Sequence, residues 1–126
     1  MLVETLETAT TWSNLETLYR AVLAALPGLH VGCHISHLYP TGASLYFTVL
    51  GAQSEDPAGQ WRALKAAASR AIVEHGGTIT HHHAVGRDHE PYLRDEVGEL
   101  GVELLRTLKT RCDPAGVMNP GKLVTL

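Results

Sequence analysis

The sequence has little of what marks several large classes of protein. Only two of its 126 residues are cysteine, Cys33 and Cys112, which excludes a disulfide framework and predicts free thiols in a cytoplasmic protein. Ten basic residues stand against thirteen acidic ones, and a net charge of −3 excludes a generally basic nucleic-acid binder. No apolar run approaches the roughly eighteen residues of a membrane-spanning helix. The N-terminus also lacks the basic and apolar regions of a secretory signal.

What is present suits one folded domain over residues 1–126. The hydrophobic share of 44% is high enough to exclude a disordered chain. A chain of this length can bury roughly two thirds of its unfolded surface. Histidine is unusually frequent, since eight of the residues are histidine and three of them are consecutive.

Hydrophobic periodicity and turn residues predict an α+β protein. Ser13 and Glu16 have the spacing of a capping box, and Asp56-Pro57 that of a helix N-cap and first turn. The strands are expected over residues 2–8, 31–38, 44–50 and 78–80, and the helices over residues 13–26, 56–75 and 90–112. The resulting order β-α-β-β-α-β is that of the ferredoxin-like split βαβ antiparallel sheet, with one additional C-terminal helix.

The second and third strands are expected to form a hairpin with a polar, open face. A five-residue loop over residues 39–43 would pair Ser36 with Tyr46 and His34 with Thr48. A polar but uncharged sheet face is suited to be the wall of a binding site, so His34 and Ser36 become candidate substrate contacts. The opposite face would lie under the helices and is apolar: Val31, Ile35, Leu45 and Phe47.

Residues 76–89 read GGTITHHHAVGRDH and form the most unusual segment of the chain. Imidazole ligates metals, moves protons near neutral pH and, when charged, binds phosphate or carboxylate. If the strand continues, His81 and His83 share a face and His82 opposes them. A purely structural role is one alternative. A zinc site is another, with ligands from His81, His83 and either His34 or His37, although the spaced Cys/His signatures are absent.

Three segments together resemble a known family: residues 76–89, the ending DPAGVMNPGKL at 113–123, and HLYPTGASLYF at 37–47. They are similar to the C-terminal domain of FAD-linked oxidases of the vanillyl-alcohol oxidase/p-cresol methylhydroxylase type. The branch that fits best is that of alkyldihydroxyacetonephosphate synthase and its bacterial relatives. The likeness extends from Glu4 to Leu123, and the triple histidine followed by Gly-Arg is its most specific part.

The resemblance implies a division of labour around FAD. In this family an N-terminal domain holds most of the FAD, and the C-terminal domain covers the flavin ring and builds the substrate pocket. This chain corresponds to the second part only, so the flavin-binding domain is absent and the chain alone should hold FAD weakly or not at all. The expected activity is that of the complete enzyme, in which an acyl chain on dihydroxyacetone phosphate is replaced by a fatty alcohol without net oxidation.

The same resemblance implies roles for individual residues. Tyr46 would be the acid/base at the substrate carbon, while the histidines would orient substrate and shuttle protons. Arg87 would help to neutralise a substrate phosphate. No residue is assigned as a metal ligand. The residues carried over are Tyr46, His81, His82 and His83 as catalytic, and Asn119, Gly121 and Lys122 as cofactor-binding.

Three alternatives stay open. D-2-hydroxyacid (lactate or glycolate) dehydrogenases of this family usually carry a histidine at the position of Tyr46 and Gly-Glu-His at the position of the triple histidine, which disfavours that branch. A stand-alone His-rich metal-binding module and a dimerisation module with an open sheet face are the others. The expected partner is a small-molecule substrate, a lipid or phosphate ester, with no nucleic acid and no transmembrane segment. A homodimer is left open, and the expected location is cytoplasmic, peripheral to a membrane through the substrate.

Overall fold

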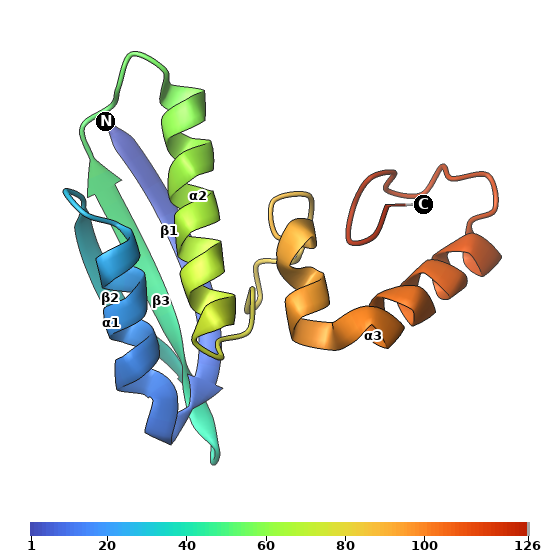
Figure 1. The fold of residues 1–126 in the computed structure, drawn as a ribbon, viewed down its shortest axis with the longest axis horizontal. Helices are drawn as coiled ribbons and strands as arrows, with labels where there is room; N and C mark the ends of the chain where they lie inside the picture. The colour runs from blue at the N-terminus through green and yellow to red at the C-terminus, as the bar shows by residue number, and fades with distance from the viewer. Residues whose placement is uncertain (126) are drawn as a thin grey trace. The chain divides into compact units, whose positions relative to one another are not determined.

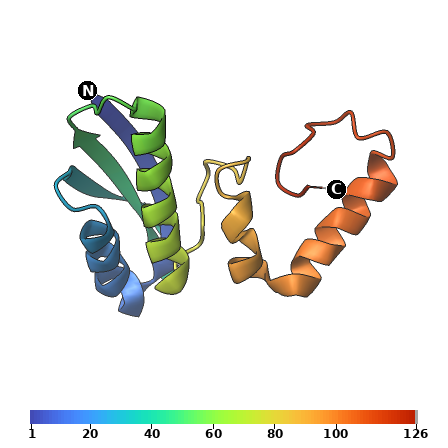
Figure 2. The same ribbon diagram turned by 45° about the horizontal axis from the view of Figure 1, so that its top comes forward.

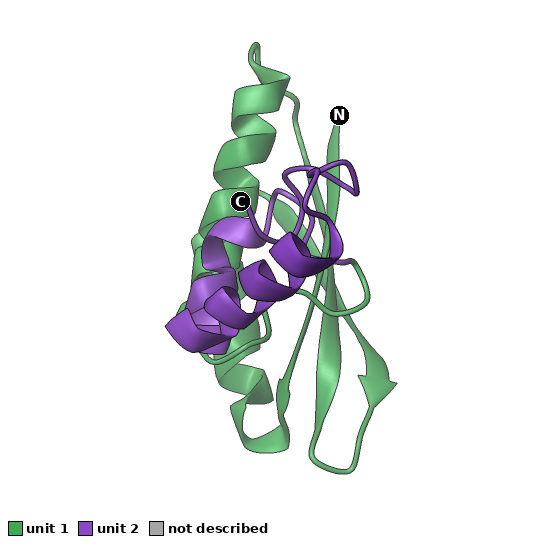
Figure 3. Cartoon of the chain, turned by 90° about the vertical axis from the view of Figure 1, so that its right-hand side faces the viewer, with its two compact units in different colours: residues 1–83 green, residues 84–126 purple. Residues whose placement is uncertain are grey.

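The computed structural model describes residues 1–125, which form an α+β fold as predicted. Within this range the elements are β1 (Leu2–Thr11), the 3-10 turn η1 (Trp12–Asn14), α1 (Leu15–Ala25), β2 (His30–Leu38), β3 (Gly42–Gly51), α2 (Pro57–Glu74) and α3 (Glu90–Cys112). The chain divides into two compact units, residues 1–83 and residues 84–126 (Figure 3). No helix of the described range is long and apolar enough to cross a membrane.

In the first unit, α1 and α2 cover one face of a three-stranded antiparallel sheet with the order β1-β3-β2 (Figures 1 and 2). Alternate residues of each strand point toward the helices, so β3 sends Leu45, Phe47 and Val49 into the core. They meet Leu18 and Val22 of α1, which are fully buried. The opposite sheet face, where Tyr46 alternates with these residues, is left for polar side chains.

The helix ends follow the expected signals in part. Asp56 caps α2 as predicted, because its Oδ1 accepts a hydrogen bond of 2.9 Å from the Gly59 amide. The capping box at Ser13 is wrong. Residue 13 lies in η1, and the N-cap of α1 is Asn14, which makes no side-chain cap bond. Cys33 and Cys112 are free, as expected.

The β2–β3 hairpin differs from the predicted register. Tyr39 N donates to Gly42 O at 2.8 Å, so the loop is a two-residue turn rather than residues 39–43. A bulge between Ile35 and Leu38 absorbs the difference, and the His37 amide there donates to Ser44 Oγ at 2.9 Å. As a result Tyr46 pairs with His34, not with Ser36. Ile35, expected in the core, is 49% exposed.

Residues 78–80 are not a fourth strand, which corrects the split βαβ prediction at its last position. The segment still runs along β1, since Thr78 N donates to Ala9 O and His81 N donates to Glu7 O, both at 3.0 Å. From the first bond to the second the segment advances by three residues while β1 advances by two. The regular hydrogen-bond pattern of an antiparallel ladder therefore cannot continue. The Thr8 hydroxyl instead donates a hydrogen bond of 2.6 Å to the Thr78 carbonyl.

The second unit contains α3 and the loop that follows it. Gly98 interrupts α3 with φ 72° and ψ 172°, so the predicted helix is present but kinked. The small apolar cluster of this unit comprises Leu93, Val102 and Val124, with Val85 and Leu105 packed against it.

We expect Glu4 to make the first unit sensitive to acid. Its carboxylate, on the helix side of β1, accepts hydrogen bonds from Trp61 Nε1 and, at 3.1 Å, from Lys65 Nζ. Burial acts to raise the pKa of Glu4, but these bonds and the Lys65 charge outweigh it and hold that pKa below the ordinary 4.5. Because the pKa of Glu4 is lower in the folded state, its ionised carboxylate stabilises the fold at pH values above 4.5. This stabilisation is lost as the pH falls through the folded-state pKa.

Glu4→Gln should therefore lower the free energy of unfolding by about 1.5–3 kcal/mol at neutral pH, and much less below the folded-state pKa. Urea unfolding followed by tryptophan fluorescence over this pH range measures both values. Glu16→Gln is the matched control, because its pair with Arg20 is exposed and should contribute under about 0.5 kcal/mol. A pH-independent loss in Glu4→Gln would contradict the assignment.

Gly77 should not tolerate a side chain. A Cβ on Gly77 would lie 2.7 Å from Thr8 Oγ1 and 2.8 Å from Leu18 Cδ2, both on buried residues. Gly77→Ala is expected to destabilise the protein by about 1–3 kcal/mol in the same urea experiment. Gly32→Ala is the control, since its nearest neighbour is Thr48 O at 3.9 Å. Equal stabilities of the two variants would refute this packing.

Candidate functional site

A buried carboxylate on the open sheet face is the centre of the candidate site. Glu7 lies on β1 directly opposite Tyr46 of β3, and the neighbouring Leu6 and Thr8 point toward the helices. The Glu7 residue is only 5% exposed. Burial acts to raise its pKa, but polar contacts with His81, Ser36 and Ser44 outweigh burial and hold the pKa of Glu7 below its ordinary value. The site thus contains a buried negative charge near neutral pH.

The triple histidine gathers around this carboxylate. His81 Nδ1 lies 3.2 Å from Glu7 Oε1, and His83 Nε2 lies 3.6 Å from Glu7 Oε2. In a continued strand, His82 would point to the face opposite to that of His81 and His83, but it does not. It has a φ of 60°, which turns the chain, and its ring stacks on that of His81 with centroids 3.9 Å apart. All three imidazoles therefore belong to one cluster.

The structure brings the predicted phenol to the same place. The rings of Tyr46 and His83 meet edge to face with centroids 5.5 Å apart. His34 is the cross-strand partner of Tyr46, and the Ser36 hydroxyl donates to Glu7 Oε1 at 3.1 Å. The structure thus brings His81, His82, His83 and Ser36 around one carboxylate, with Tyr46 beside His83 and His34 opposite Tyr46 on the next strand.

Sequence reasoning missed two members of this cluster and gave a third only as an alternative. Glu7 and Tyr39 were not predicted, and His37 was named only for a zinc site. The Tyr39 hydroxyl lies 3.0 Å from His81 Nε2, and His37 Nε2 lies 3.8 Å from Glu7 Oε1. One signal was available for Glu7, since it is the single acid on a strand face that otherwise carries Val3, Thr5, Ala9 and Thr11. No spacing in the sequence connects it to residues 81–83.

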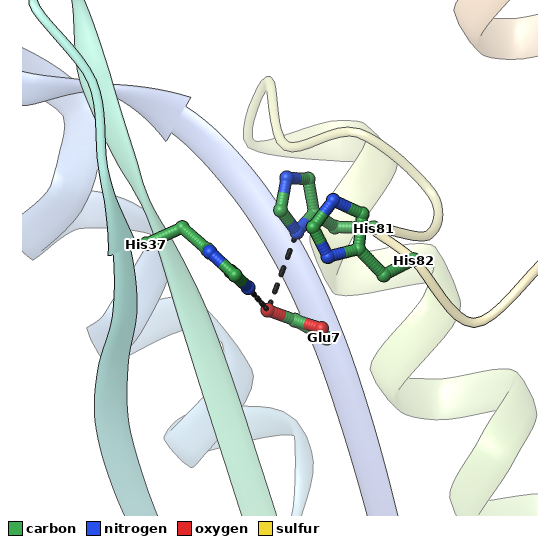
Figure 4. A group of neighbouring side chains, drawn as sticks. All are labelled: Glu7, His37, His81 and His82. Carbon is green, nitrogen blue, oxygen red and sulfur yellow. Dashed lines mark ion pairs between the residues drawn. The ribbon is translucent and has the colours of Figure 1, made fainter.

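Four of these side chains could hold a metal ion. One ligand atom each from Glu7, His37, His81 and His82 can be chosen so that all four lie within 4.8 Å of one another. Figure 4 shows His37 approaching the carboxylate from one side and His81 and His82 from the other.

The remaining predicted residues lie in the second unit. Arg87 packs beside Gly121, where an added Cβ would be 3.6 Å from the Arg87 guanidinium, and Leu123 N donates to Gly86 O at 3.0 Å. The loop over residues 119–122 is therefore held next to Arg87. Its positive φ values, 46° at Asn119 and 66° at Gly121, turn the backbone tightly.

Asp113 anchors the start of this loop. Its carboxylate accepts hydrogen bonds from the amides of Val117 at 3.0 Å and Met118 at 2.9 Å, and it pairs with Lys109. The bond from Lys109 is the largest cause that holds the pKa of Asp113 below its ordinary value. The loop presents exposed Asn119, Gly121 and Lys122 beside the exposed Arg87. Two cations, an amide and a glycine backbone fit the anionic and carbonyl groups of FAD or of a phosphate ester.

Comparisons with known proteins point to the same family. The family model described as FAD linked oxidases, C-terminal domain, matches residues 1–123. Alkyldihydroxyacetonephosphate synthase of Trypanosoma brucei brucei is 37% identical over 95 residues, which are 75% of this chain and 16% of that protein. The protein of the same name from Dictyostelium discoideum is 31% identical over 134 residues, 98% of this chain and 22% of that protein.

A solved structure of an alkyldihydroxyacetonephosphate synthase superposes with a TM-score of 0.59 at 27% identity, over 94% of this chain and 20% of the other. The chain thus spans about a fifth of the length of the relatives that it matches. With its fold and nearly all of its residues matched, the chain belongs to the family of FAD linked oxidases, C-terminal domain.

Proposed function

We propose that this chain is the substrate-binding C-terminal domain of an FAD-dependent enzyme of the alkyldihydroxyacetonephosphate synthase type. The observation that carries the proposal is the contact of the Tyr46 ring with His83, itself 3.6 Å from the buried Glu7 carboxylate. The similarity to two alkyldihydroxyacetonephosphate synthases supports the choice of reaction. That reaction replaces the acyl chain of an acyl-dihydroxyacetone phosphate by a fatty alcohol.

In this proposal Tyr46 is the acid/base at the substrate carbon. A phenol that gives up or takes a proton needs a nearby group that compensates the change in charge. His83 is that neighbour, and the Glu7 carboxylate stabilises His83 when the imidazole is protonated. Glu7 therefore acts as a positioning residue for the catalytic pair. His81 and His82 hold the other side of the cluster and orient the substrate, with His34 and Ser36 on the adjacent sheet face.

Substrate phosphate and cofactor are assigned to the second unit. Arg87 offers a planar guanidinium for a phosphate group, and Asn119, Gly121 and Lys122 offer polar contacts to FAD. FAD, when bound, supplies the electron-accepting ring at which the substrate carbon is activated. The flavin would be held mainly by the part of the enzyme outside this chain. The residues of this chain bind the substrate, orient it and move its protons.

Tyr46→Phe in the complete FAD-containing enzyme tests this assignment. Loss of the phenolic proton should reduce turnover of acyl-dihydroxyacetone phosphate with a long-chain alcohol by at least about 100-fold, the lower range of acid–base catalysis. The flavin absorbance per protein should not change. Release of the fatty acid measures the rate.

Tyr19→Phe is the matched control, because the Tyr19 ring packs on Phe47 on the helix side of the sheet and should leave turnover unchanged. Loss of FAD or of folding in Tyr46→Phe would make the tyrosine structural and refute its catalytic role. Oxidation of D-lactate or glycolate by the wild-type enzyme, without alkyl exchange, would assign the dehydrogenase activity instead.

A further inference from the structure

The two oxygens of the Glu7 carboxylate divide the histidine cluster into two halves. Oε2 faces His83, which contacts Tyr46. Oε1 faces the other half, with His81 Nδ1 at 3.2 Å and His37 Nε2 at 3.8 Å. The proton transfer proposed for Tyr46 uses only the first half. The second half, to which the proposed function gives the orientation of the substrate, also brings several metal-ligating atoms together.

The contacts of His81 leave one of its ring nitrogens in an unusual position. Nε2 is within 3.0 Å of the Tyr39 hydroxyl, while Nδ1 is buried. Although Nδ1 is close to Glu7 Oε1, it makes no hydrogen bond among the residues that the structure describes. In the tautomer of His81 that donates its Nε2 proton to the Tyr39 hydroxyl, the lone pair of Nδ1 faces the lone pairs of the carboxylate. Two acceptors so close repel each other unless a cation lies between them.

The surrounding rings bring two further imidazoles to the same place. The centroid of His37 lies 4.6 Å from that of His82 and 5.3 Å from that of His81. Neutral imidazoles are metal ligands, and a single divalent ion would satisfy their lone pairs together. The positive φ of His82, a costly conformation for a residue with a side chain, keeps its ring in this cluster.

We propose that Glu7, His37, His81 and His82 form a zinc site that is separate from the Tyr46–His83 pair. Zinc bonds of about 2.0–2.2 Å in a tetrahedron place neighbouring ligand atoms about 3.3–3.6 Å apart. The distances of 3.2 and 3.8 Å from Glu7 Oε1 bracket this range. Three imidazoles and one carboxylate are a donor set for zinc rather than for magnesium or calcium, which prefer oxygen ligands.

Tyr39 completes the site as an outer-shell residue. A ligating histidine usually donates its other ring N–H to an oxygen, which fixes the tautomer and the orientation of the ring. The Tyr39 hydroxyl is in that position for His81. Four protein ligands close the coordination sphere, as in structural zinc sites. The ion would connect the end of β2 and the triple-histidine loop to β1, which holds His83 in place beside Tyr46.

Zinc titration of the purified protein tests the proposal without any assay of turnover. After removal of metals with a chelator, zinc alone is added in competition with a chromophoric chelator. The wild type should bind one equivalent. Glu7→Gln, His37→Ala and His81→Ala should each weaken binding by at least about 100-fold, and Tyr39→Phe by about 10- to 100-fold, the usual effect of an outer-shell change.

His30→Ala is the matched control, because His30 is an exposed residue at the start of β2, outside the cluster. This variant should bind zinc like the wild type. Cobalt in place of zinc should give the intense visible bands of a tetrahedral complex. Far-UV circular dichroism reports on folding. If Glu7→Gln does not fold, the zinc affinities of His37→Ala and Tyr39→Phe decide the test, because His37 is half-exposed and Tyr39 lies in a turn.

Absence of zinc binding by the wild type would overturn the proposal. So would retention of full affinity by His37→Ala and His81→Ala, which would indicate unspecific binding by surface histidines. Neither result affects the proposed flavin enzyme, whose test is the turnover of Tyr46→Phe. Conversely, the complete enzyme could bind one equivalent of zinc through this cluster and yet catalyse no alkyl exchange. That result would support the zinc site and refute the proposed function.

Discussion

A single buried carboxylate organises the functional face of this protein. Glu7 is placed by the alternation of β1 on the sheet face opposite the helices, where it would be unfavourable without partners. The triple-histidine segment and the bulged end of β2 supply those partners. The His81 amide donates to Glu7 O, and the side chains of His81, His83 and Ser36 approach the Glu7 carboxylate. The constraint that orders the site is therefore electrostatic, while the helix side of the sheet is ordered by apolar packing.

Small irregularities of the backbone create this arrangement. The bulge between Ile35 and Leu38 places His34 opposite Tyr46. The failure of residues 78–80 to form a ladder strand, together with the positive φ at His82, lets three successive imidazoles face one carboxylate. A regular strand would have sent alternate histidines to opposite faces. Departures from regular structure of this kind are common at binding sites, because they aim side chains that a regular ladder would separate.

The family membership and the geometry describe different levels of function. Membership links the chain to FAD-dependent enzymes that are about five times its length. The geometry identifies which atoms of this chain lie together: a phenol beside an imidazole on one oxygen of Glu7, and the proposed zinc ligands on the other. The two proposals use different halves of the same cluster, so they can be tested separately.

The sequence by itself determined the α+β class, the order of the first five elements, the N-cap of α2, the apolar side of β3 and the residues of the triple-histidine cluster. These depend on local periodicity and on turn chemistry, which neighbouring residues encode. Only the tertiary structure decided that Glu7, His37 and Tyr39 join the cluster, that Tyr46 pairs with His34, and that residues 78–80 run beside β1 without forming a strand. These outcomes depend on hairpin register and on contacts between residues more than seventy positions apart, such as Glu7 and His81, and no local pattern carries that information.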